Sequence, residues 1–142
     1  MKPTFRLIAI GGLLSFLLIL GCASSTKEVM ATKESQLKLR SIQARAFETT
    51  DKTKMLRTVI STLQDLGFVV DKADDKIGLV SGTKLSGYSL RMTVTVNQRG
   101  SSQLLVRANA QYNIHAVEDP EPYQQFFDAL SKSIFLAAQQ VD

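Results

Sequence analysis

Cysteine and histidine are nearly absent from this sequence, which has one of each among its 142 residues. A single cysteine excludes an intramolecular disulfide framework, and one cysteine with one histidine argues against a zinc site built from several such ligands. A large excess of charge of one sign is also missing, because 17 lysines and arginines are opposed by 13 acids. The length, the 44% of hydrophobic residues and the 21% of charged residues are typical of a single globular domain rather than a disordered chain.

The apolar run near the start of the sequence is too short to cross a membrane. Residues 7–20 read LIAIGGLLSFLLIL, fourteen residues without a charge, whereas a membrane-spanning helix needs about 20. Lys2 and Arg6 precede this run without an acid, and small residues and then the polar sequence SSTKE follow it. This order predicts a secretory signal over residues 1–21. A transmembrane anchor or a buried core helix is the alternative, which the polar continuation disfavours.

The end of this segment, Ile19-Leu20-Gly21-Cys22, resembles the lipobox of bacterial lipoproteins. That motif has an aliphatic residue three before an invariant cysteine and a small residue directly before it; Leu20 is bulkier than the usual residue at its position, which such motifs tolerate. The resemblance implies cleavage between Gly21 and Cys22, diacylglycerol on the sulfur of Cys22 and acylation of the freed amine. The alternative for Cys22 is a buried, inert thiol. Each buried CH₂ contributes about 0.8 kcal/mol, so several acyl chains on one residue would hold the protein firmly at a membrane.

The resemblance also implies a location. In lipoproteins an aspartate after the cysteine favours retention in the inner membrane, and here Ala23 stands at that position. We therefore expect lipid anchoring at the outer membrane, with the protein on its periplasmic face. Removal of residues 1–21 would leave 121 of the 142 residues and, without Lys2 and Arg6, lower the net charge from +4 to +2. Residues 22–38 are mostly polar and predict a flexible tether, although a short helix from Ser35 stays open, and residues 39–142 form the expected periplasmic domain.

The first half of this domain alternates between strand and helix signals. Residues 40–47 place Ile42, Ala44 and Ala46 in alternation with Gln43 and Arg45, which predicts a strand. A helix is expected next, with capping oxygens at Thr49-Thr50-Asp51, an end at Gly67 and an apolar stripe of Met55, Leu56, Val59, Ile60, Leu63 and Leu66. Residues 68–70 then begin a strand, residues 74–76 form a turn, and residues 77–84 return as a second strand.

The second half predicts a long hairpin and a final helix. Apolar residues alternate with polar ones on both sides of the turn at 98–101, at Leu90, Met92, Val94 and Val96 and at Leu104, Val106, Ala108, Ala110, Tyr112 and Ile114. Asp119-Pro120 is a helix start, followed by the stripe Tyr123, Phe126, Phe127, Leu130, Ile134, Ala137 and Val141. The predicted fold is α+β, a two-layer sandwich in which two helices cover one face of an antiparallel sheet in the order β-α-β-β-β-β-α.

A second resemblance covers about a third of the chain, residues 40–84. This segment is similar to one found in small uncharacterised bacterial lipoproteins, and the likeness is carried by Arg45, Phe47, Thr50, Asp51, residues 63–68, Gly78, Leu79 and Lys84. More distantly, the element order resembles the helix-grip domains of a lipoprotein component of the β-barrel assembly machinery. The likeness implies a fold and carries over no functional residue.

No catalytic or metal-binding motif is evident in the sequence. His115 has no nearby serine or second cysteine, the acids at 71–75 lack the calcium-loop spacing, and the glycines at 78–87 spell no phosphate loop. Tyr123, Phe126 and Phe127 fit core positions of a helix better than a partner-binding patch. We therefore expect no enzyme activity and no cofactor or metal beyond the covalent lipid on Cys22.

The leading hypothesis is a lipid-anchored, non-enzymatic interaction or accessory module that supports an envelope assembly or transport complex. Its partners would be the membrane, through the acyl chains, and an envelope protein, whereas a secretory signal argues against nucleic acid. The docking surface would be a strand edge or the polar face of the sheet, here Arg91, Thr93, Thr95, Arg107 and Asn109. The basic stretch 27–57 fits either anionic head groups or a solvated tether.

Two alternatives stay open. The first is a periplasmic carrier of a small apolar ligand held between helices and sheet, where Ala44, Ala46, Ala108 and Ala110 would leave room. The second is a hydrolase in which His115 meets an acid in a polar cleft.

Overall fold

The computed structural model describes residues 35–85 and 89–139. The predicted signal, the lipidation site at Gly21-Cys22 and most of the predicted tether lie outside these residues. The chain divides into two compact units, residues 1–37 and 38–142, and the account below concerns the second. Residues 35–42 are helical, so the helix that the sequence left open from Ser35 is present, and it occupies the first part of the predicted strand 40–47.

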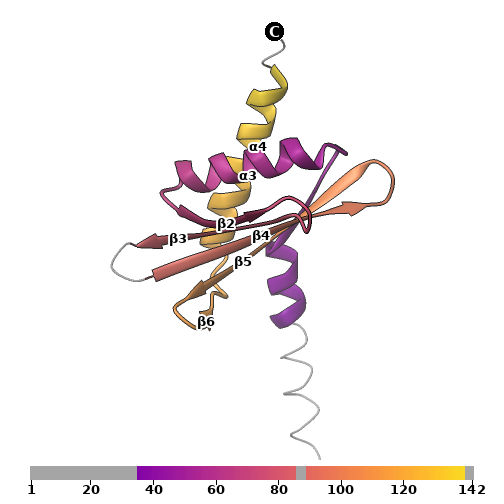
Figure 1. Ribbon diagram of the computed structural model, residues 1–142. Helices are drawn as coiled ribbons and strands as arrows, with labels where there is room; N and C mark the ends of the chain where they lie inside the picture. Colours follow the sequence, from indigo (N-terminus) through magenta and orange to yellow (C-terminus); the bar gives the residue numbers. More distant parts are fainter. Residues whose placement is uncertain (1–34, 86–88, 140–142) are drawn as a thin grey trace, which may run out of the picture. The chain divides into compact units, whose positions relative to one another are not determined.

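The protein is an α+β protein with an open antiparallel sheet, as predicted (Figure 1). In chain order its elements are β1 (Ala44–Phe47), α3 (Lys52–Asp65), β2 (Val69–Asp74), β3 (Leu79–Leu85), β4 (Ser89–Arg99), β5 (Gln103–Tyr112), β6 (His115–Ala116) and α4 (Glu121–Gln139). The strands lie in the order β1-β5-β4-β3-β2, and β6 pairs with the end of β5 beyond β1. The two-residue β6 and the helix at 35–42 are additions to the predicted order.

Both ends of α3 follow from its sequence. Asp51 is the N-cap, and its Oδ1 accepts a hydrogen bond of 2.8 Å from the Lys54 amide. At the other end the Phe68 and Gly67 amides donate to the Leu63 and Gln64 carbonyls, both at 2.9 Å, with Gly67 at φ +84°. This is a Schellman ending, which needs a left-handed residue after the helix. The helix therefore stops where the chain must turn into β2.

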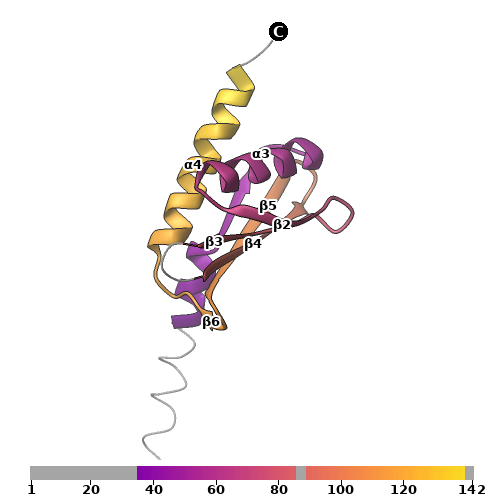
Figure 2. The same ribbon diagram turned by 60° about the vertical axis from the view of Figure 1, so that its left-hand side comes forward.

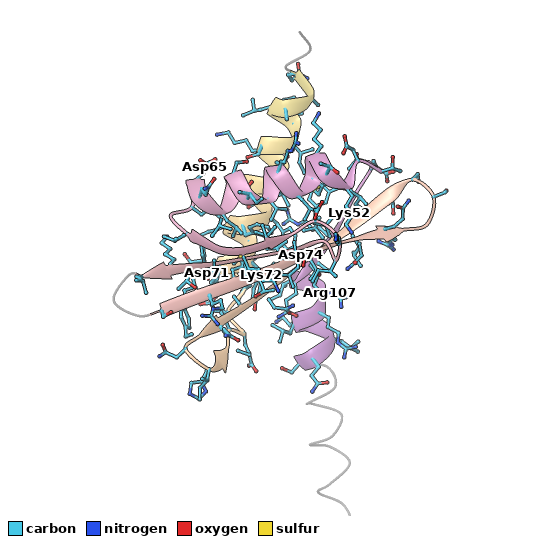
Figure 3. All side chains as sticks on the ribbon, in the orientation of Figure 1. Lys52, Asp65, Asp71, Lys72, Asp74 and Arg107 are labelled. Carbon is cyan, nitrogen blue, oxygen red and sulfur yellow. The ribbon has the colours of Figure 1, made fainter. Side chains whose placement is uncertain are left out.

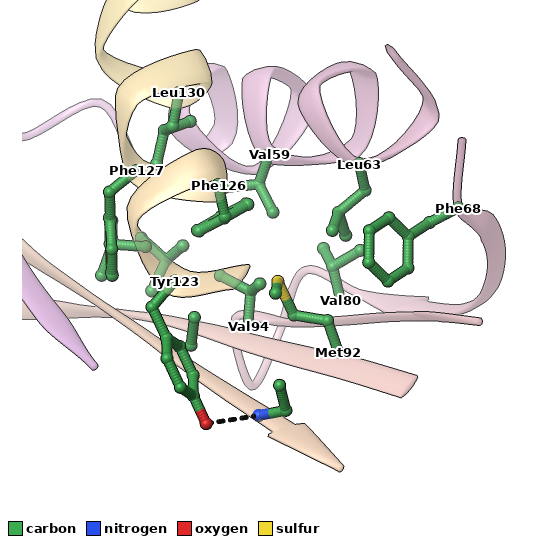
Figure 4. Close-up of a cluster of buried hydrophobic side chains, with 14 of the residues drawn as sticks. Val59, Leu63, Phe68, Val80, Met92, Val94, Tyr123, Phe126, Phe127 and Leu130 are labelled. Carbon is green, nitrogen blue, oxygen red and sulfur yellow. Dashed lines mark hydrogen bonds between the residues drawn. The ribbon is translucent and has the colours of Figure 1, made fainter. Parts of the chain in front are cut away.

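One hydrophobic core fills the space between the helices and one face of the sheet (Figures 2 and 4). The predicted helix stripes and the inward residues of the long hairpin supply it, which confirms two helices on one face. Its fully buried members with the largest side chains are Val59, Leu63, Val80, Met92, Val94, Val96, Leu104, Val106, Tyr123, Phe126, Phe127 and Leu130. Phe126 and Phe127 meet edge to face with ring centroids 5.1 Å apart, so the aromatic residues of α4 are core, as expected.

The Tyr123 hydroxyl closes a gap in the sheet edge between β1 and β6. It donates to the Val117 carbonyl at 2.7 Å and accepts from the Ala110 amide at 3.2 Å, the bond drawn in Figure 4. The Gln43 side-chain amide donates to the same oxygen at 3.2 Å. The Ala110 amide belongs to β5 where neither β1 nor β6 pairs with it, so this buried hydroxyl satisfies backbone groups that a continuous edge strand would otherwise satisfy.

The prediction of which β1 residues face the core was wrong. Ala44 and Ala46 pair with Arg107 and Leu105 of β5, on the face away from the helices. Arg45 instead lies on the helix side, where its guanidinium sits 3.1 Å from Asp128 of α4 and 5.1 Å from the centre of the Phe127 ring. A long aliphatic stem lets an arginine occupy an inward edge position while its charge stays at the surface. The small residues of β1 therefore leave no room between helices and sheet.

The end of β5 also differs from the prediction. The strand stops at Tyr112, and Asn113, at φ +53°, begins a turn. Ile114, expected on the core face, is consequently 86% exposed.

Candidate interaction face

The five residues predicted as an interaction face all lie on one surface of β4 and β5. Thr93 pairs directly with Asn109, and Thr95 pairs with Arg107, while Arg91 lies opposite Gln111. Alternation along each strand directs these side chains away from the core, because the intervening residues of β4 and β5 are buried. The sheet register thus brings together residues that are up to 18 positions apart in the sequence.

The same surface extends over β3 and β2. Ser81 pairs with Thr93 and, on its other side, with Lys72, while Thr83 pairs with Arg91. A continuous polar row therefore crosses four strands, from Lys72 through Ser81 and Thr93 to the second strand of the long hairpin. We call the surface the open face and define it by Lys72, Ser81, Thr83, Arg91, Thr93, Thr95, Arg107, Asn109 and Gln111. The sequence missed the contribution of β2 and β3, although the alternation in LVSGTKL was a signal for it.

The charged groups of the open face have unequal surroundings. Arg91 and Arg107 are exposed, and among the described residues no ion pair or side-chain hydrogen bond involves either guanidinium group. The acids at the β2 edge are engaged locally: Asp71 accepts a hydrogen bond of 2.6 Å from the Thr83 hydroxyl, and Asp74 accepts one of 3.3 Å from the Ile77 amide. Figure 3 labels Arg107 and, on β2, both acids with Lys72 between them. Two guanidinium groups are thus left to interact with something outside the described chain.

A cavity of about 320 Å³ lies at one end of the sandwich, where the end of α3 and the start of α4 meet the sheet. Leu66, Phe68, Leu90, Met92, Tyr112 and Pro122 line it together with the polar residues Lys84, Asp119, Glu121 and Gln125. The Lys84 ammonium donates to the Leu66 carbonyl at 2.9 Å and lies 5.9 Å from the centre of the Phe68 ring. The interlayer space is therefore packed at its middle and hollow at this end.

The residues considered for catalysis and metal binding are dispersed. His115 is exposed in the short strand β6. Within 35–85 and 89–139, no three histidine, cysteine, aspartate or glutamate side chains gather in a way that could hold a metal ion. Asp74 stabilises the turn between β2 and β3 through its bond to the Ile77 amide, which is the structural role that the sequence favoured for this acidic segment.

Comparison with known proteins adds no family. No protein-family model matches the chain, and no curated protein matches it significantly. Among the described helices, none combines the length and the apolar character that crossing a membrane requires.

Proposed function

We propose that this chain is a lipid-anchored, non-enzymatic protein of a bacterial cell envelope whose open face docks on a protein partner in an envelope assembly or transport complex. The observation that carries the docking surface is the polar, helix-free side of the sheet, on which Arg91 and Arg107 have no partner within the described chain. The sequence supports the anchor through the lipobox-like Ile19-Leu20-Gly21-Cys22. Within the described residues, α3 and α4 pack on the other side of the sheet, so neither of them covers the open face.

The anchor is tested by Cys22→Ala. Without the thiol no thioether to diacylglycerol can form, so the variant should leave the membrane pellet after a carbonate wash, whereas the unaltered chain stays in it. A variant that remains in the pellet would contradict lipid anchoring at this residue.

The docking surface is tested by placing a photo-reactive benzoylphenylalanine at Asn109, in the middle of the open face. Gln64, an exposed amide residue on α3, is the matched control position on the opposite layer. Irradiation of cells should give one reproducible protein adduct from position 109 and none of the same size from position 64. Equal adducts from both positions, or none from position 109, would count against docking through the open face.

The end cavity favours a second candidate function, a carrier of a small apolar ligand. Its volume of about 320 Å³ is at the lower limit of small-molecule sites, and Phe68, Leu90 and Met92 are among the residues that line it. The fluorescent probe N-phenyl-1-naphthylamine should then bind saturably, and Leu90→Trp, which fills the cavity, should abolish the binding. Leu105→Trp, on the other face of the sheet, is the control; absence of saturable binding to the unaltered chain would end this candidate function.

A further inference from the structure

The two arginines of the open face form a pair with a defined spacing. Arg107 lies opposite Thr95, which is four residues from Arg91 along β4, so their backbone positions are about 14 Å apart at ~3.3 Å per residue and ~4.8 Å between neighbouring strands. The positions between them carry Thr93 and Asn109, which are small and polar. Both arginines stand on the rigid centre of the sheet rather than on a loop, and this fixes the separation of their backbone positions.

The strands nearest this pair carry no acid on their outward side. The outward-facing residues of β3, β4 and β5 include none, whereas Asp71 and Asp74 lie at the β2 edge, two strands from Arg91, where each accepts a hydrogen bond from this chain. An arginine presents a planar fork of donors that matches a carboxylate with two parallel hydrogen bonds. Electrostatic complementarity therefore requires anionic groups on whatever covers the open face.

We propose, building on the proposed function, that the partner is a protein that presents two carboxylates to the open face, one to Arg91 and one to Arg107. The Thr93 and Thr95 hydroxyls and the Asn109 amide, which both donate and accept, hydrogen-bond to polar groups between the two carboxylates. Specificity then comes from two ion pairs held on one rigid sheet with hydrogen-bonding positions between them.

Anionic lipid head groups are a weaker match for the same charges. Each cation near an anionic bilayer contributes roughly fivefold in affinity, so two arginines would give only about 25-fold. The residues between the arginines are polar, and the exposed apolar side chains of this face, Val69 and Leu85, lie outside the pair on β2 and at the end of β3. A rigid surface that offers directional hydrogen bonds suits a folded or extended protein segment better than it suits a lipid bilayer.

The experiment converts each arginine into a reporter of neighbouring carboxylates. A carbodiimide joins a carboxylate to an amine but not to a guanidinium, so Arg91→Lys and Arg107→Lys each add a reactive group where the unaltered chain has none. The full chain is treated in isolated envelope membranes, and the new cross-link is located by peptide mass spectrometry. Arg57→Lys, an exposed arginine of α3, is the matched control for chance collisions with acidic proteins.

The expected result is a cross-link from positions 91 and 107 to aspartates or glutamates of the same protein, at least tenfold more abundant than any from position 57. Cross-links no more abundant than in the control would overturn the inference. If the benzoylphenylalanine adduct from position 109 still forms, the proposed docking through the open face is retained and only the inference of an acidic partner is contradicted. If that adduct is also missing, both the proposed docking and the inference are contradicted. Binding of the purified chain to phosphatidylglycerol vesicles that Arg91→Gln plus Arg107→Gln abolishes, without a protein cross-link, would assign the face to lipid and likewise overturn the inference.

Discussion

Replacing Tyr123 by phenylalanine removes one oxygen atom and should test whether that hydroxyl holds the sheet edge together. The ring stays in the core, where the side chain is fully buried, so packing hardly changes. Two buried backbone groups lose a partner, the Ala110 amide and the Val117 carbonyl. The Gln43 amide also loses its acceptor but is only partly buried and can turn to water.

The size of the destabilisation follows from the number of buried polar groups that lose their hydrogen-bond partner. Leaving a buried donor or acceptor unsatisfied costs about 1–3 kcal/mol, so two of them should lower the free energy of unfolding by about 2–6 kcal/mol. That is a large share of the ~5–15 kcal/mol by which small domains are stable. With a urea m-value of about 1–1.5 kcal/mol/M, a loss of ~3 kcal/mol lowers the midpoint by about 2–3 M.

Urea unfolding followed by circular dichroism measures this change, on a chain that starts at residue 22 and carries Cys22→Ser to prevent lipidation. Gln43→Ala is the control, because it removes one partner of the Tyr123 oxygen and leaves both backbone bonds intact; it should cost less than about 1 kcal/mol. Hydrogen exchange adds a local measurement, since the Ala110 amide should lose protection in Tyr123→Phe. A loss below about 0.5 kcal/mol with an unchanged m-value would refute the reasoning.

Two further stability predictions use the same assay. Gly78→Ala and Gly100→Ala both place a side chain at positive φ, +70° and +64°, which costs about 1 kcal/mol. At Gly78 the added Cβ would also clash with the Val96 carbonyl oxygen, whereas Gly100 has nothing within 4 Å. Gly78→Ala should therefore be less stable than Gly100→Ala by at least about 2 kcal/mol; equal midpoints would contradict this. Thr62 is buried with an unpartnered hydroxyl, so Thr62→Val should raise the free energy of unfolding by about 1 kcal/mol, and a destabilised variant would indicate that this hydroxyl does have a partner.

Strong local signals explain what could be predicted from the sequence. The ends of α3 are examples. The N-cap needs a side-chain acceptor, which Asp51 supplies, and the residue after the helix needs a positive φ, which Gly67 adopts, so both ends can be predicted without the rest of the fold. The long hairpin has ten paired positions, and a sheet with one wet face makes their alternation unambiguous. For that reason the five residues of the predicted interaction face were found together on one surface.

Short elements depend on distant partners instead. β1 has four residues, too few for alternation between Ala44, Arg45 and Ala46 to identify the inward side. Its orientation follows from pairing with β5, about 60 residues later, and from Asp128 and Phe127 of α4, which accept the Arg45 guanidinium. The two residues of β6 carry no periodicity at all and are a strand because β5 pairs with them. Tyr123 was expected in the core, but its bonds to three separate segments depend on the completed fold.

The arginines of the open face are not explained by folding. An outward position on a one-sided sheet requires a polar residue that suits a strand, and threonine at 93 and 95 satisfies this without charge. Arg91 and Arg107 form no ion pair with an acid among the described residues, so Arg91→Gln plus Arg107→Gln should leave the free energy of unfolding within about 0.5 kcal/mol of that of the unaltered chain. The same double variant should lose the benzoylphenylalanine adduct at position 109, because binding would depend on the guanidinium groups. A large loss of stability would show that the two arginines serve the fold, and the adduct could then no longer be attributed to their charge.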